Sequence, residues 1–177
     1  MKLKKWKKLS TEQKFSNFWW SYKIDKYTLP DGTEGEYHYA FTFGSVFIIP
    51  VTSEGKIIMV EQYRYLNDRF SIEFPGGGVK NENGHDSQAV KELVEETGFK
   101  GELEYAAMYN PFNGVTNEIC KVYIARNLKP SSQYKKDNSE EFILHEFTPE
   151  EIERMISSNE IYDGMTLASW ALVKNKI

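Results

Sequence analysis

The sequence predicts one mixed domain of the α/β or α+β class, and three observations support that expectation. The chain has 177 residues with a hydrophobic fraction of 40%, which suits a single domain with one core. Aromatic and β-branched runs, which are typical of strands, fill its first half. The pattern becomes helical at about residues 87–97, and short strands and helices follow. No repeat or long linker divides the chain, so these elements should share one core.

The strands of the first half are predicted as two pairs. Residues 18–24 and 36–41 are expected to be strands, joined through the turn signal Pro30-Asp31-Gly32. The runs 44–51 and 56–63 are separated by four residues that end in a glycine, which is the length of a hairpin loop. Both of these later runs are too apolar for an exposed sheet face, so we expect them in the buried sheet.

The helical pattern has recognisable ends. Apolar residues recur at helical spacing from about Ser87 to Thr97, and Gly98 follows where it can end a helix. Thr148 followed by Pro149-Glu150-Glu151 has the pattern of a capping box at a helix start. The remaining predicted elements are strands at 102–108, 120–125 and 142–147, and helices at about 149–156 and 165–173.

The composition favours a small-molecule partner. A formal charge of −4 and a pI near 5.5 argue against nucleic acid or an anionic membrane as the main partner. Cys120 is the only cysteine, which excludes an intrachain disulfide, and the charged start lacks the apolar stretch of a secretory signal. No apolar run approaches the ~20 residues of a membrane-spanning helix. We therefore expect a cytoplasmic protein whose lysine-rich first residues are a solvated terminus.

The segment that is most informative about a possible active site joins a glycine-rich turn to an acidic helix. Gly76-Gly77-Gly78 precede the helix, and Glu92, Glu95 and Glu96 fall at i, i+3 and i+4 on one helical face. Each close pair of like charges costs roughly 0.2–0.5 kcal/mol on an exposed helix unless a cation lies between them. Magnesium suits such a site, because it prefers oxygen ligands and combines a few carboxylates with phosphates and waters. In isolation, a solvated glutamate-rich face is the alternative.

This segment resembles the Nudix box, in which a glycine is followed by a glutamate and then by Arg-Glu-apolar-any-Glu-Glu-any-Gly-apolar. The matching residues are Gly77, Glu92, Leu93, Glu95, Glu96, Gly98 and Phe99. The resemblance implies an α/β/α sandwich with a mixed central sheet and an added N-terminal antiparallel strand region. It also implies that Glu92, Glu96 and the carbonyl of Gly76 hold Mg²⁺, with Mn²⁺ as the alternative ion, and that Glu95 supports them in catalysis.

Two positions depart from the box. Asn83 stands where the family has its first glutamate, beside Glu82, and Lys91 stands in place of the arginine. In the family those two residues form an acid–base pair that braces the loop against the helix, so this brace is weakened here. A Nudix-like regulator that binds nucleotides without turnover therefore stays open as an alternative.

Beyond the box, residues from about 6 to 172 are similar to the ADP-ribose pyrophosphatase and nucleotide-sugar hydrolase branch. Two matching elements are Glu61-Gln62-Tyr63-Arg64 and Glu73-Phe74-Pro75-Gly76-Gly77. The resemblance implies that Arg64 and Glu73 belong to the substrate-binding site, where the planar fork of an arginine suits phosphate. An arginine paired with a surface carboxylate is the alternative for Arg64.

Two later loops also resemble that branch. Residues 110–118 are similar to its loop after the box, which makes Glu118 a candidate substrate contact, with a plain turn as the alternative. Residues 137–143 are similar to an acidic loop that can supply the general base. Glu140 is the first candidate for that base, and Glu141 and Glu118 are not separated from it by the sequence.

Residues 1–42 are expected to form an N-terminal strand region, and residues 43–177 the catalytic domain. In the branch, an N-terminal strand, sometimes from a partner chain, stacks on the nucleobase, and Phe18 and Trp19 lie at that place. Packing in the core or in a dimer interface is the alternative. His38 aligns near a position that can contact substrate phosphate. A homodimer is implied by the resemblance alone.

The resemblance implies a divalent-metal-dependent hydrolase acting on the diphosphate of ADP-ribose or a related nucleoside diphosphate sugar. The products would be a nucleoside monophosphate and a sugar phosphate, and preference for GDP-mannose or another sugar nucleotide is the runner-up. Other phosphate-binding motifs, G-x-x-x-x-G-K-[ST] and G-x-G-x-x-G, do not occur. One cysteine and three scattered histidines do not offer the ligand spacing of a zinc site.

Overall fold

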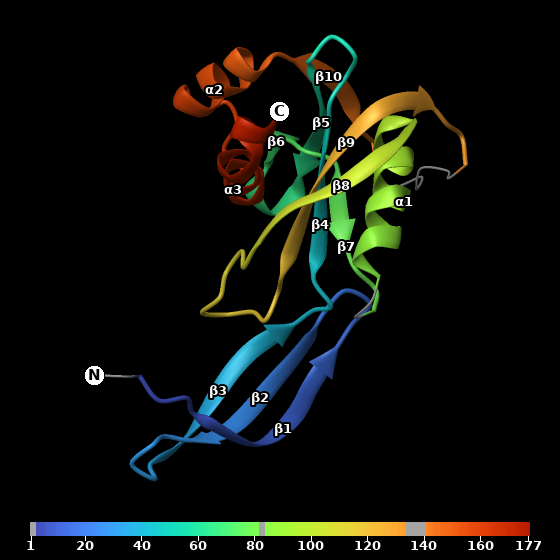
Figure 1. The fold of residues 1–177 in the computed structure, drawn as a ribbon. Helices are drawn as coiled ribbons and strands as arrows, with labels where there is room; N and C mark the ends of the chain where they lie inside the picture. Colours follow the sequence, from blue (N-terminus) through green and yellow to red (C-terminus); the bar gives the residue numbers. More distant parts are fainter. Residues whose placement is uncertain (1–2, 82–83, 134–140) are drawn as a thin grey trace.

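The computed structural model describes residues 3–81, 84–133 and 141–177. Figure 1 shows an elongated molecule, in which a three-stranded sheet projects from one end of a larger body of strands and helices. Across the described residues, we find no helix with the length and apolar character required to span a membrane.

The projecting sheet is an antiparallel meander of β1 (Lys7–Ser16), β2 (Ser21–Thr28) and β3 (Glu34–Phe41). Only two strands are predicted here from the sequence, and β1 is not one of them. Every residue of β1 is exposed, so the sequence of β1 has no alternation of apolar and polar residues that would predict a strand. Its backbone is instead held by pairing with β2 along its whole length.

The first predicted strand also began too early, because residues 17–20 form the turn between β1 and β2. The side-chain oxygen of Asn17 accepts hydrogen bonds from the backbone amides of Trp19 (2.9 Å) and Trp20 (2.8 Å). This is the local side-chain hydrogen bonding by which asparagine stabilises turns. Phe18 and Trp19 therefore lie at the end of a hairpin, where both side chains are exposed, and not within a strand.

The larger body contains two further sheets. One has the order β7-β4-β9-β8, and the other has the order β10-β5-β6. β4 pairs in parallel with β9 and antiparallel with β7, so the four-stranded sheet is mixed as predicted. The strands are β4 (Ser45–Pro50), β5 (Ile57–Arg64), β6 (Arg69–Glu73), β7 (Gly76–Gly78), β8 (Phe99–Tyr109), β9 (Cys120–Pro130) and β10 (Ile143–Phe147), with 3-10 turns at Tyr65–Asn67 and Lys174–Lys176.

Helices cover both sides of this body. α1 (His85–Thr97) lies on one side, and α2 (Pro149–Ser157) and α3 (Gly164–Val173) lie on the other (Figure 1). The predicted helix ends are confirmed: Gly98 ends α1 with a φ of 73°, and Thr148 and Glu151 form a capping box at the start of α2. α1 begins at His85, two residues before the predicted start.

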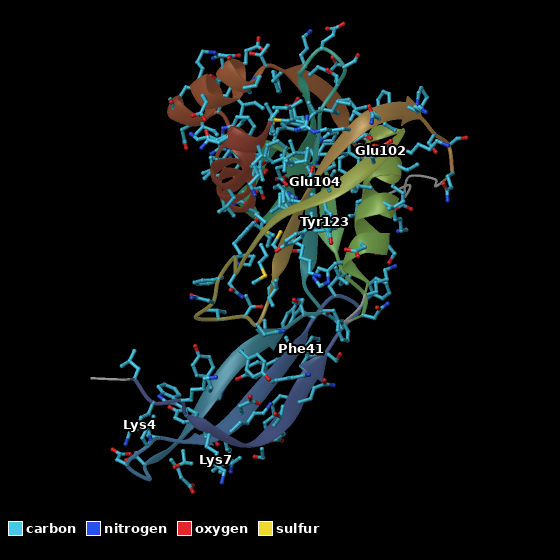
Figure 2. The ribbon with its side chains drawn as sticks, in the orientation of Figure 1. Lys4, Lys7, Phe41, Glu102, Glu104 and Tyr123 are labelled. Carbon is cyan, nitrogen blue, oxygen red and sulfur yellow. The ribbon has the colours of Figure 1, made fainter. Side chains whose placement is uncertain are left out.

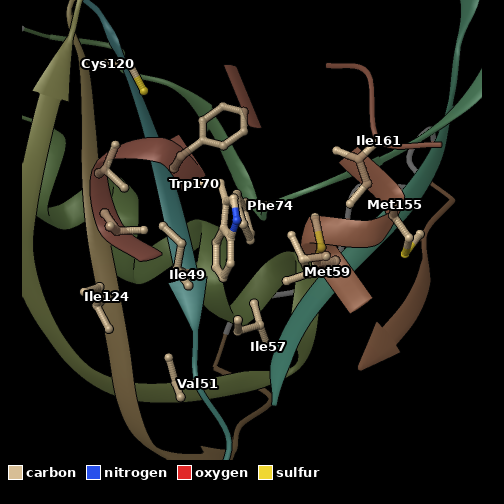
Figure 3. Packing of buried hydrophobic residues seen from close by; sticks show 14 residues of the cluster. Ile49, Val51, Ile57, Met59, Phe74, Cys120, Ile124, Met155, Ile161 and Trp170 are labelled. Atoms are coloured by element: carbon tan, nitrogen blue, oxygen red, sulfur yellow. The ribbon is translucent and has the colours of Figure 1, made fainter. Parts of the chain in front are cut away.

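Two apolar clusters lie on the two faces of the sheets. Val46 and Ile48 of β4 pack with Leu93 of α1, whereas their neighbours Phe47 and Ile49 face the other way. This is the period of two that a strand buried on both faces must show. Figure 3 shows the larger cluster, in which Trp170 of α3 lies against Phe74 with ring centroids 6.2 Å apart. The expected α/β/α sandwich is thereby confirmed.

Candidate active site

A cavity of about 800 Å³ lies between the N-terminal sheet and α1. One wall consists of the glycine strand β7 and the acidic face of α1, including Glu92, Glu95 and Glu96. The other wall comes from the turn between β1 and β2, with Phe18, Trp19 and Trp20, and from parts of β2 and of the connection between β3 and β4. The cavity therefore brings together residues more than 70 positions apart in the chain.

The three glutamates lie on one face of α1, as their spacing predicted, and each has a partner in the protein. Glu96 is buried, and its Oε2 accepts a hydrogen bond from the Gly76 amide at 2.9 Å. Glu92 accepts one from the Gln88 side chain at 2.6 Å, and Glu95 forms an ion pair with Lys91 at 2.7 Å. The acidic face is thus held against the glycine strand by the carboxylate of Glu96.

Two of the three glycines in β7 are required by close packing. A Cβ on Gly77 would collide with the carboxylate of Glu92, and a Cβ on Gly76 would collide with the backbone carbonyl of Val46. A Cβ on Gly78 would meet open space. The missing side chain at position 77 therefore leaves the room in which the Glu92 carboxylate lies.

The donor set suits a hard divalent cation. Across the described residues, no three acidic, histidine or cysteine side chains meet in a preformed cluster. Magnesium does not require one, because it commonly takes one or two carboxylates and completes its octahedron with waters and substrate phosphates. Glu92 and Glu96 supply such carboxylates on the cavity wall, and the space beside Gly77 accommodates one of them. The residues present therefore fit the ion.

Arg64 and Glu73 form a bidentate ion pair. Arg64 Nε donates to Glu73 Oε1 at 2.8 Å, and its Nη2 donates to Oε2. Glu73 is almost completely buried, whereas the Arg64 side chain is 47% exposed. The hydrogen bond with Glu73 raises the pKa of Arg64, and the negative charges of Asp163 and Glu96 contribute in the same direction. The pair lies in the electrostatic field of Glu96 but does not line the cavity, so its role toward substrate stays a prediction.

The cavity also contains cations that the sequence analysis did not single out. Lys80 Nζ lies 5.2 Å from the Phe18 ring centroid, and Lys23 Nζ lies 3.3 Å from that of Phe41. Within the described part of the chain, neither lysine forms an ion pair with a carboxylate. No motif connects these isolated lysines, and only the folded arrangement places them on one cavity.

The other predicted site residues are not brought together in this cavity. His38 lies on β3, where its Nδ1 is 2.6 Å from the Tyr22 hydroxyl, and it does not line the cavity. Glu118 lies in the loop between β8 and β9, half-buried, with its backbone amide bound to Thr116 Oγ1 at 3.0 Å. Glu140, Glu82 and Asn83 lie outside the described residues, so the first candidate for the base stays a prediction. Glu141 is described and exposed.

The family model for the NUDIX domain matches residues 42–165. The chain belongs to the Nudix family. The expected family and its pyrophosphohydrolase class are thereby confirmed, and the box residues run from Gly77 in β7 through α1 to Phe99 at the start of β8.

Individual relatives extend over nearly the whole Nudix chain. A methanol dehydrogenase activator of Bacillus methanolicus is 34% identical, covering 91% of this chain and 88% of the relative. An ADP-ribose pyrophosphatase of Bacillus subtilis (strain 168) is 30% identical, covering 90% and 88%. The crystal structure of an ADP compounds hydrolase superposes with a TM-score of 0.82 at 16% identity, covering 99% of this chain and 95% of that chain. This last likeness shows that the two proteins share a fold.

Proposed function

We propose that this Nudix protein hydrolyses the diphosphate of ADP-ribose or of a related nucleoside diphosphate sugar to a nucleoside monophosphate and a sugar phosphate. The observation that carries this proposal is the two-sided cavity, with carboxylates on one wall and exposed aromatic rings on the other. A nucleotide needs both, because its diphosphate requires charge compensation and its base requires a flat apolar surface. The relative from B. subtilis, named an ADP-ribose pyrophosphatase, supports the choice of substrate.

Glu92, Glu96 and the carbonyl of Gly76 would hold Mg²⁺ or Mn²⁺, with Glu95 in support. When bound, the ion neutralises charge on the diphosphate and activates it and water for hydrolysis. Gly76 has two roles in this wall. Its amide donates to the Glu96 carboxylate, and the absence of a side chain allows β7 to lie close to β4. Lys91 lies beside this set and holds Glu95 in place at 2.7 Å.

Substrate binding would come from both walls. Phe18 and Trp19 would stack on the nucleobase, and Lys23 and Lys80 would add positive charge that attracts an anionic ligand. Arg64 and Glu73 do not line the cavity; by the family resemblance, Glu73 would fix Arg64, whose remaining donors would bind phosphate. Glu140, Glu141 or Glu118 would orient or deprotonate the attacking water. A homodimer in the cytoplasm is part of the proposal.

A substrate panel tests the proposal. ADP-ribose, GDP-mannose, ADP-glucose and diadenosine polyphosphates are incubated with the protein, with and without magnesium, and the nucleotide products are separated and identified. We expect magnesium-dependent release of AMP from ADP-ribose. Faster cleavage of GDP-mannose would assign the runner-up substrate, and no cleavage of any compound would contradict hydrolysis.

A second candidate function is regulation of another enzyme. The relative from B. methanolicus is named as an activator of methanol dehydrogenase, and Asn83 and Lys91 depart from the Nudix box. The same panel separates the two functions when binding is also measured by isothermal titration. Tight binding of intact nucleotide with magnesium, but without products, would favour the regulatory function.

A further inference from the structure

The N-terminal sheet is attached to the Nudix core by the loop between β8 and β9. β3 lies beside this loop through a parallel bridge between Ala40 and Thr116, and Figure 1 shows the loop next to the end of β3. The Ala40 amide donates to the Val115 carbonyl at 3.0 Å, and the Tyr37 hydroxyl donates to the Gly114 carbonyl at 2.9 Å. The second half of β3 is therefore hydrogen-bonded to backbone carbonyls of the loop.

The Asn117 side chain completes this attachment. Its Oδ1 accepts from the Thr42 amide and its Nδ2 donates to the Thr42 carbonyl, both at 2.9 Å. One side chain thus pairs with both backbone groups of Thr42, as a neighbouring strand would. Thr42 is the residue directly after β3, and Gly44 then turns the chain into β4 with a φ of 105°. Asn117 therefore holds the chain at the point where the N-terminal sheet meets the core.

The loop that carries Asn117 is itself fixed. The Asn110 side chain donates to the Glu118 carbonyl at 2.9 Å, which closes the loop across its two ends. The amides of Val115 and Thr116 both donate to the Phe112 carbonyl at 3.0 Å. Since these bonds lie within the loop, Asn117 projects from a rigid support.

Pairing of β2 with β3 links the attachment at Thr42 to the aromatic wall of the cavity. β2 pairs with β3 over its whole length, and Ser21, next to the turn of residues 17–20, is opposite Phe41. The aromatic turn and Thr42 are therefore at the same end of the sheet. Figure 2 shows Phe41 at this end, next to the core, and Lys4 and Lys7 at the far end. Any rotation of β3 about Thr42 would carry Phe18 and Trp19 with it.

We propose that Asn117 is a positioning residue for substrate binding, which sets the aromatic wall of Phe18 and Trp19 across the cavity from the carboxylates of α1. The inference rests on the proposed function for the identity of the substrate. It assigns to the loop after the Nudix box the task of joining the two walls of the site. Glu118, the next residue, is held by the same loop.

The first test compares Asn117→Ala with Asn113→Ala. Asn113 is an exposed asparagine of the same loop with no side-chain hydrogen bond within the described residues, so it is a matched control. We expect the KM for ADP-ribose to rise about tenfold in Asn117→Ala, because two modest hydrogen bonds are lost. The kcat should be unchanged, because Glu92 and Glu96 lie on α1 and the Glu118 carbonyl keeps its hydrogen bond from Asn110. Equal KM values in the two variants, or a loss confined to kcat, would overturn the proposal.

A reversible crosslink provides a rescue. Ala40→Cys and Thr116→Cys, added to Asn117→Ala, place two thiols at the paired positions of the bridge, within the range of Cα separations that a disulfide spans. The native Cys120 is buried and should not interfere. Oxidation should return the KM toward the wild-type value, and reduction should raise it again in the same protein. An oxidised protein whose KM stays raised would contradict the positioning role.

Hydrogen exchange of the free protein separates this inference from the proposed function. Asn117→Ala should speed amide exchange in β3 and in residues 17–20 relative to Asn113→Ala, without any substrate present. Unchanged exchange would overturn the inference, whatever the substrate. A wild-type protein that shows the exchange difference between variants but does not cleave ADP-ribose would instead refute the proposed function alone.

Discussion

At the scale of single residues, the ion pair Arg64–Glu73 links a buried carboxylate to a half-exposed guanidinium. Both oxygens of a nearly fully buried carboxylate receive donors from one guanidinium. In the register of β5 with β6, Arg64 is opposite Arg69 and Val60 is opposite Glu73, so Arg64 and Glu73 share one sheet face and their side chains meet along the strands. A charge buried in this way is tolerated only because its partner is present.

We therefore predict that Glu73→Gln lowers the free energy of unfolding by about 2 kcal/mol, because it leaves one charge-assisted hydrogen bond without its acceptor. Urea unfolding of the variant and of the wild type measures this difference. Glu104→Gln is the control, because Glu104 is exposed on β8. Equal unfolding midpoints for all three proteins would show that the pair contributes nothing.

His85 gives a second prediction at this scale. Its ring is buried against Gly44, and its Nε2 has no hydrogen-bond partner within the described residues. Burial lowers the pKa of the imidazole below its usual 6.5, and the charge of Lys121 adds to this effect. As the pH falls, the unfolded chain takes up the proton first, so stability present above 6.5 is lost below it.

We expect the unfolding midpoint of the wild type to fall between about pH 7 and about pH 5, and this loss to be smaller in His85→Gln. His38→Gln, at an exposed histidine of β3, is the matched control. Thermal unfolding at a series of pH values makes the comparison. Identical slopes for His85→Gln and the wild type would contradict the assignment.

At the scale of elements, β7 leaves the space in which the carboxylate of Glu92 lies. Gly77→Ala should displace that carboxylate and raise the magnesium concentration for half-maximal turnover by roughly 10–100-fold, the usual range for disturbed supports of metal ligands. Gly78→Ala is the matched control, since a Cβ there meets open space. Magnesium titrations of ADP-ribose hydrolysis measure both. The same magnesium requirement in both variants would argue against metal binding at Glu92.

The same elements show what the sequence could and could not predict. The acidic face of α1 and its end at Gly98 could be predicted from the sequence. Helical periodicity and a left-handed glycine both depend on neighbouring residues alone. β1 could not be predicted, since its residues are exposed on both faces and only pairing with β2 makes it a strand. The turn at Asn17 could not be predicted either. Its neighbours Phe18 to Trp20 have the aromatic composition of a strand, whereas hydrogen bonds to the Asn17 side chain form a turn.

At the scale of the whole molecule, the site depends on how the N-terminal sheet faces the Nudix core. The shared helix face of Glu92 and Glu96 could be predicted from their spacing, and their candidate role in metal binding and that of Phe18 and Trp19 in stacking come from the resemblance. Their meeting across one cavity is a property of the tertiary fold. For the same reason, Lys23 and Lys80 could not have been found from the sequence, because each is an isolated lysine until the two parts are placed together.

The aromatic wall makes a prediction at this scale. Trp19→Ala should raise the KM for ADP-ribose about tenfold and leave kcat unchanged, because stacking of a base on an aromatic ring contributes about 1–3 kcal/mol. Trp6→Ala is the control: Trp6 stacks on Tyr27 with ring centroids 4.6 Å apart and does not line the cavity. Steady-state kinetics separates KM from kcat. An equal KM in both variants would place the nucleobase elsewhere.

We propose that the carboxylates of α1 support metal-dependent hydrolysis of a nucleotide diphosphate in this cavity. The most direct measurement is the rate of AMP release from ADP-ribose over a magnesium titration, for wild type, Glu96→Gln and Glu104→Gln. Glu96→Gln keeps the shape and an acceptor for the Gly76 amide, so it should fold normally while its turnover falls by about 100-fold or more. Glu104→Gln should match the wild type. Equal turnover in all three proteins, or turnover that does not depend on magnesium, would contradict metal-dependent hydrolysis at these carboxylates.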